Sequence, residues 1–120
     1  MADVLALVDD LFFQSKMAET ARHVGVTLQT VSSGAALVAA VAAPAATAPR
    51  LLLVDLNARQ GPLEAIESLH ASGNSLPVIA FLSHVQVELA ERARAAGCRQ
   101  VMPRSQFTAG LADILRQAKT

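Results

Sequence analysis

The chain has 120 residues, of which 52% are hydrophobic and 17% are charged, and this composition fits one globular domain with a single core. Its ten basic and ten acidic residues cancel, so no charge excess marks it for binding nucleic acid or an anionic membrane. The single cysteine, Cys98, excludes an internal disulfide and a cysteine-based zinc site. Because acidic residues interrupt the first apolar run, we predict no signal peptide and expect a cytoplasmic location.

Strand and helix patterns alternate along the chain. In chain order they predict a strand at residues 4–8, a helix at 12–24, a strand at 26–31, a helix at 34–43, a strand at 51–54, a helix at 62–71, a strand at 76–82, a helix at 85–96, a strand at 98–102, a turn at 103–106 and a helix at 107–118. Uninterrupted apolar runs are typical of strands buried on both faces, whereas apolar residues three and four apart are typical of helices. We favour a helix over a low-complexity linker across residues 35–48 because alanine is the best helix former.

This alternation predicts an α/β fold. Strands that alternate with helices form a mostly parallel sheet, covered by helices on both faces and joined by right-handed crossovers. Five strands favour the flavodoxin-like order 2-1-3-4-5, in which the first and third strands are neighbours. We expect residues 1–120 to form this one domain.

Acidic residues end the two strands that this order makes neighbours. Asp9 and Asp10 follow the first strand, and Asp55 follows the third. Ligands of open α/β sheets bind at the carboxyl ends of the strands, where these three side chains are expected to meet. Crowded carboxylates repel one another unless a cation relieves them, and carboxylates, a backbone carbonyl and water are ligands that suit Mg²⁺. The alternative is that each acid is simply a solvated strand end.

These residues resemble the receiver domain of two-component response regulators. The resemblance rests on Asp9 and Asp10 after the first strand, Asp55 after the third, Asn57 two residues later, and Ala96-Gly97 before the fifth strand. It implies that Asp55 accepts a phosphoryl group from a histidine kinase, a phosphotransfer protein or a small phosphodonor. It also implies that Asp9, Asp10, Asp55 and the backbone carbonyl of Asn57 hold a magnesium ion.

Two positions depart from the receiver pattern. Receivers carry Thr or Ser at the end of the fourth strand, where an ungapped count places Leu82 and leaves Ser83 one residue late. They also carry a Lys after the fifth strand; counting from the preceding Ala-Gly places Arg104 there, whereas anchoring on Pro103 would place Met102. An arginine can grip a phosphoryl group with two hydrogen bonds, but its rigid fork differs from a flexible ammonium. Ser83 and Arg104 are therefore the candidates for these two roles.

The sequence supports three hypotheses about function. The first is a stand-alone, atypical receiver that is not an enzyme, takes a phosphoryl group on Asp55 with Mg²⁺ in a phosphorelay, and signals through protein contacts. By resemblance, its partner surface is formed by the helix at 85–96, the strand at 98–102 and the last helix, with a homodimer as a further option. The second is a pseudo-receiver, a phosphorylation-independent interaction or dimerisation module. The third is an α/β enzyme or small-ligand binder that uses the same carboxylate pocket.

Overall fold

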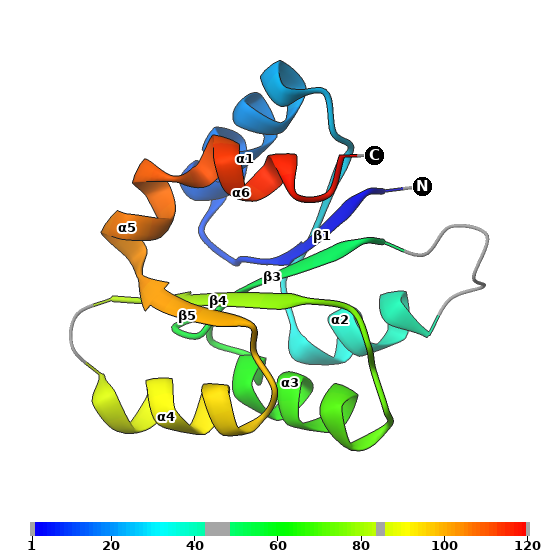
Figure 1. The fold of residues 1–120 in the computed structure, drawn as a ribbon, viewed down its shortest axis with the longest axis vertical. Coiled ribbons are helices and arrows are strands. Elements are labelled where there is room, and N and C mark those ends of the chain that lie inside the picture. Colours follow the sequence, from blue (N-terminus) through cyan, green and yellow to red (C-terminus); the bar gives the residue numbers. More distant parts are fainter. Residues whose placement is uncertain (1, 43–48, 84–85, 120) are drawn as a thin grey trace.

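The computed structural model describes residues 2–42, 49–83 and 86–119, and in these ranges strands and helices alternate (Figure 1). The elements are β1 (Val4–Leu7), α1 (Leu11–Val24), β2 (Leu28–Val31), α2 (Gly34–Val41), β3 (Leu51–Asp55), α3 (Pro62–Ala71), β4 (Val78–Leu82), α4 (Val87–Ala95), β5 (Gln100–Pro103), α5 (Arg104–Ala109) and α6 (Leu111–Arg116). Within those three ranges, every helix is too short or too polar to cross a membrane.

The five strands form one parallel sheet in the order β2-β1-β3-β4-β5, which confirms the predicted fold class. Along the pair of β1 and β3, Val4 lies beside Leu51 and Leu7 beside Val54. Val8 and Asp55, which follow Leu7 and Val54, therefore lie at the same edge of the sheet. This register is what positions the acidic residues of the candidate site.

Two layers of helices cover the sheet (Figure 1). Side chains alternate between the faces of a strand, so Leu51 and Leu53 of β3 pack in the hydrophobic cluster of α1 and α6. Leu52 and Val54 pack on the opposite face, in the cluster of α2, α3 and α4. Because all four side chains are fully buried, β3 is the centre of both cores.

The end of the chain differs from the prediction. A turn was expected at 103–106 and one helix at 107–118, but α5 runs from Arg104 to Ala109 and α6 begins at Leu111, with Gly110 between them. The turn prediction was wrong because Pro103, with an extended backbone, acts as the N-cap of a helix instead of marking a turn. Gly110 interrupts the helix while Phe107 and Leu111 on either side remain buried.

Other boundaries shift by one or two residues. β5 runs later than the predicted strand at 98–102, and β4 starts at Val78 rather than at residue 76. The predicted start of a helix at residue 85, the end of the helix at 34–43 and most of the loop that follows it lie outside the described residues.

The helices α2 and α3 meet at a pair of glycines. The backbone N–H of Gly34, at the start of α2, donates to the carbonyl oxygen of Gln60 at 2.7 Å. A Cβ atom on Gly34 would lie 2.2 Å from the carbonyl oxygen of Gly61, the N-cap of α3. The two helices can approach this closely only because Gly34 has no side chain.

Candidate functional site

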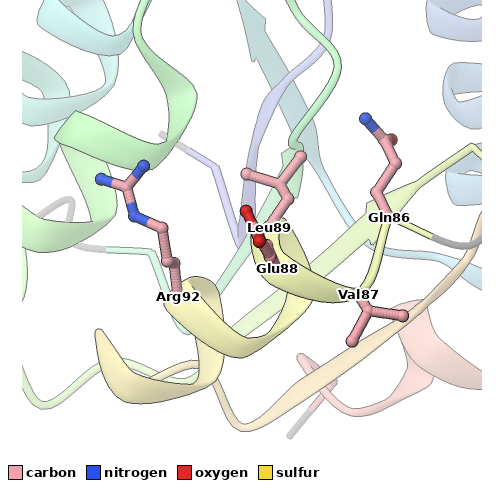
Figure 2. Close-up of a pocket in the computed structure, with 5 residues that line it drawn as sticks. All are labelled: Gln86, Val87, Glu88, Leu89 and Arg92. Atoms are coloured by element: carbon pink, nitrogen blue, oxygen red, sulfur yellow. The ribbon is translucent and has the colours of Figure 1, made fainter.

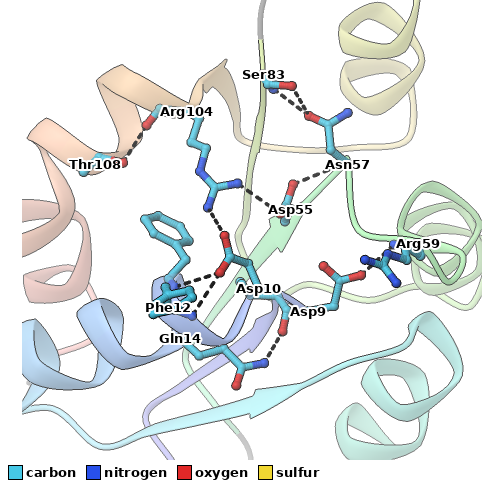
Figure 3. Close-up of polar contacts among 12 residues, drawn as sticks. Asp9, Asp10, Phe12, Gln14, Asp55, Asn57, Arg59, Ser83, Arg104 and Thr108 are labelled. Carbon is cyan, nitrogen blue, oxygen red and sulfur yellow. Dashed lines mark hydrogen bonds and ion pairs between the residues drawn. The ribbon is translucent and has the colours of Figure 1, made fainter.

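The three predicted acids lie at one edge of the sheet (Figure 3). Asp55 is the last residue of β3 and is only 3% exposed, whereas Asp9 and Asp10 follow β1 and are partly exposed. Asp55 is therefore not a solvated strand end. A carboxylate buried this deeply is costly unless hydrogen bonds or a cation stabilise it.

Asp9 and Asp10 are held by backbone N–H groups. The Oδ1 atom of Asp10 accepts from the backbone nitrogen of Phe12 at 2.9 Å and of Phe13 at 3.2 Å, so Asp10 is the N-cap of α1. The Oδ2 atom of Asp9 accepts from the backbone nitrogen of Arg59 at 2.9 Å. Each side chain thus has a structural partner of its own, and the two point in different directions (Figure 3).

Arg104 connects Asp10 with Asp55. Its Nη2 atom lies 3.1 Å from Oδ2 of Asp10, and its Nη1 atom lies 3.7 Å from Oδ2 of Asp55. The guanidinium carbon is 4.2 Å from the centroid of the Phe13 ring and 6.0 Å from that of Phe81. The guanidinium therefore lies between two carboxylates and the face of an aromatic ring, a favourable place for a cation.

The pKa values of Asp55 and Asp10 shift in opposite directions. Burial raises the pKa of Asp55, although the N–H of Asn57 and the charge of Arg104 both act to lower it. The pKa of Asp10 is lowered, chiefly by the hydrogen bond from the backbone N–H of Phe13. Hydrogen bonds favour the charged form of Asp10, whereas loss of water disfavours the charged form of Asp55.

Asn57 joins Asp55 to the end of β4. Its backbone N–H donates to Oδ1 of Asp55 at 2.9 Å. Its side-chain Oδ1 accepts from the backbone N–H of Ser83 at 2.6 Å and from the Ser83 hydroxyl at 3.0 Å, and its Nδ2 donates to Oε1 of Gln86 at 2.8 Å. Leu82 is the buried last residue of β4, so the exposed Ser83 is the hydroxyl nearest this edge, and it contacts Asn57 (Figure 3).

The carboxylates as arranged do not fit a magnesium ion. Their oxygen donors have the right chemistry, but among residues 2–42, 49–83 and 86–119 no group of three or more acidic, histidine or cysteine side chains is placed to share an ion. Mg²⁺ demands nearly ideal octahedral geometry, and here the Arg104 guanidinium lies between Asp10 and Asp55. The magnesium site expected at Asp9, Asp10, Asp55 and Asn57 stays a prediction.

The start of α4 carries a shallow hollow beside the site. It has a volume of about 470 Å³ and is lined by Gln86, Val87, Glu88, Leu89 and Arg92 (Figure 2). It contains none of the predicted site residues, and its link to Asp55 runs through the hydrogen bond between Gln86 and Asn57. Sequence reasoning missed Gln86 and the aromatic support of Arg104, since neither belongs to a motif.

The structure closely resembles solved receiver domains. A response regulator of red-light signalling from R. palustris matches with a TM-score of 0.79 at 17% identity, over 97% of this chain and 92% of that one. The receiver domain of NtrX from Brucella abortus matches with a TM-score of 0.78 at 21% identity, over 97% of both chains. A response regulator receiver domain protein from Clostridium thermocellum matches with a TM-score of 0.81 at 13% identity, over 98% of this chain and 94% of that one.

No protein-family model matches the chain, and no curated protein matches it in sequence. At the identities of the solved structures, the likeness establishes the fold. The chain has the fold of response regulator receiver domains, with an acidic edge where ligands of such sheets bind.

Proposed function

We propose that the chain is an atypical receiver domain of two-component signalling in which Asp55 accepts a phosphoryl group. One observation carries the proposal: the buried carboxylate of Asp55 ends the central strand and faces the guanidinium of Arg104 across 3.7 Å. A nucleophile and a cation are thus placed together at the edge where an α/β sheet binds its ligand.

The proposed reaction is a phosphoryl transfer. An oxygen of ionised Asp55 attacks the phosphorus of a phosphohistidine on a kinase or phosphotransfer protein. The phosphorus–nitrogen bond breaks, its electron pair stays on the imidazole, and an aspartyl phosphate forms. Arg104, about one third exposed, supplies positive charge and two N–H donors for the phosphoryl oxygens. The proposal assigns no step of this reaction to magnesium.

The proposed output is a protein contact on the face expected from α4, β5 and the last helix, which is divided into α5 and α6. An apolar groove of about 210 Å³ lies between α4 and β5 and is lined in part by Leu82, Val87 and Val101. Val87, which is 57% exposed, adds an accessible apolar side chain to the border of this groove, where a protein partner could bury it. No charge excess in the chain suggests nucleic acid as the partner.

A second candidate is the pseudo-receiver, which uses the same fold without phosphorylation. Two observations favour it. Asp55 is almost fully buried beneath Arg104, so a donor has little access to its oxygens. The Ser83 hydroxyl already donates a hydrogen bond to Oδ1 of Asn57, so its proton is not free for a phosphoryl oxygen.

Intact-mass measurement after incubation with acetyl phosphate distinguishes the two candidates. We expect the wild type to gain the mass of one phosphoryl group and Asp55→Asn to gain none, in buffers with and without magnesium. Asp113→Asn, which removes an exposed carboxylate of α6, is the matched control and should label like the wild type. If the wild type gains no mass under conditions that label an ordinary receiver, the pseudo-receiver is the correct function.

A further inference from the structure

We infer that the guanidinium of Arg104 is the resident cation of the acidic edge and excludes a divalent cation from Asp10 and Asp55. The inference concerns the same site as the proposed function but does not require that Asp55 be phosphorylated. The carboxylate oxygens of Asp10 and Asp55 have the chemistry that suits a hard cation, yet the cation beside them is the guanidinium of Arg104.

The first argument is the position of the charge. The two guanidinium nitrogens lie 3.1 Å from Oδ2 of Asp10 and 3.7 Å from Oδ2 of Asp55, so one side chain serves both carboxylates. A metal ion that bridged the same two oxygens would have to occupy the space between them. It would meet the like charge of the Arg104 guanidinium at short range.

The second argument is that a cluster of phenylalanine rings supports the guanidinium of Arg104. The guanidinium lies over the ring of Phe13, and the rings of Phe81 and Phe107 stack next to Phe13 with centroids 4.1 Å apart. Cation–π attraction and two carboxylates thus act on the same group. Arg104 is also the first residue of α5, so its backbone is fixed by the end of β5. A bound ion would have to displace an anchored group.

The third argument is that Asp9 and Asp10 each have an oxygen already engaged by a backbone N–H group. The Oδ2 atom of Asp9 accepts the N–H of Arg59, on the loop after β3, and Asp10 uses its Oδ1 to cap α1. The oxygen of Asp10 that remains is the one bonded to Arg104. Hence a metal ion would compete with Arg104 for its ligands.

A manganese titration followed by amide NMR tests the inference, since Mn²⁺ broadens signals near its binding site. We expect the wild type to show no saturable broadening centred on Asp10 and Asp55. Arg104→Met should bind Mn²⁺ there with an affinity increased by about tenfold or more, because a like charge is removed and two oxygens are freed. Arg116→Met, which breaks an arginine–aspartate pair on α6, is the matched control and should behave like the wild type.

Three results would overturn the inference. The first is saturable broadening at Asp10 and Asp55 in the wild type, which needs no variant to fold. The second is an unchanged affinity in Arg104→Met, or in Arg104→Gln if the methionine variant does not fold. The third is binding that survives in Arg104→Met/Asp55→Asn, since the ion would then lie elsewhere. Phosphoryl uptake is read separately by mass, so the proposed function and this inference can fail independently.

Discussion

At the scale of single residues, the ionised form of Asp55 opposes folding. Burial raises the pKa of Asp55. At pH values between the ordinary pKa of an aspartate and the higher pKa of Asp55 in the fold, the native state therefore binds more protons than the unfolded chain. Stability therefore falls as pH rises through that window. The charge of Asp10 acts in the other direction: its pKa is lowered, and its contribution is lost as pH falls through its value in the folded state.

Asp55→Asn is accordingly expected to stabilise the protein. At neutral pH the substitution removes a buried charge and keeps an oxygen to accept the N–H of Asn57, so the melting temperature should rise by roughly 2–5 °C. Thermal unfolding followed by circular dichroism measures the change. The gain should shrink at acid pH, where Asp55 is protonated in both states. Asp113→Asn should give no such rise, and a lower melting temperature for Asp55→Asn would contradict the argument.

The position of the acidic residues could be predicted because neighbouring parallel strands end at the same edge of a sheet. Asp9, Asp10 and Asp55 lie at one edge as expected, since parallel neighbours end together, and Arg104 reaches that edge as well. The detailed partners could not be predicted. That Ser83 bonds to Asn57 depends on the exact path of the chain after β4.

At the scale of elements, the glycine and proline residues at element ends explain both the correct and the incorrect predictions of helix boundaries. The helix predicted at 12–24 does end at Val24, because Gly25 takes the left-handed conformation there, with φ of 88°. Pro103 misled because proline is common in turns and also just before a helix. Arg92 of α4 lies 3.5 Å from Glu67 of α3, a contact between helices that sequence spacing does not reveal.

The contact of α2 with α3 gives a prediction for Gly34→Ala. Alanine at a helix start would ordinarily be favourable, but here its Cβ would lie 2.2 Å from the carbonyl oxygen of Gly61 and push the helices apart. We expect the free energy of unfolding of Gly34→Ala to fall by about 1–3 kcal/mol, the usual cost of overpacking a core. Urea denaturation measures the change.

Gly110→Ala is the matched control for that experiment. A Cβ there would meet its nearest neighbour at 3.5 Å, an ordinary contact, and the backbone φ of −100° suits alanine. Its stability should stay close to that of the wild type. If both variants lost the same free energy of unfolding, the close contact between α2 and α3 would not be the reason that position 34 requires glycine.

At the scale of the whole molecule, one sheet divides two cores that share a central strand. The fold class could be predicted because strand and helix patterns alternate five times, and few topologies accommodate that alternation. The boundaries could not be predicted to the residue, since apolar residues continue just outside some strands, as Val8, Val26 and Leu76 do. The aliphatic core provides few local signals: 3% of the residues are aromatic.

Because β3 belongs to both cores, the two should unfold together. Leu52→Ala and Leu53→Ala each remove a fully buried side chain, on opposite faces, and each should cost about 2–5 kcal/mol of unfolding free energy. Urea unfolding followed by circular dichroism, and by amide signals from each face, should give a single shared transition for both variants. Separate midpoints for the two faces would contradict a single cooperative unit.

The hydrogen bond from Asn57 to Asp55 makes the two oxygens of that carboxylate chemically distinct. Oδ1 accepts the N–H of Asn57, while Oδ2 faces Arg104. A phosphoryl donor that reached this side chain would therefore be directed to Oδ2, and Oδ1 would become the carbonyl oxygen of the resulting mixed anhydride without leaving its N–H donor. The fold thus confers regioselectivity on a group that is symmetric in solution.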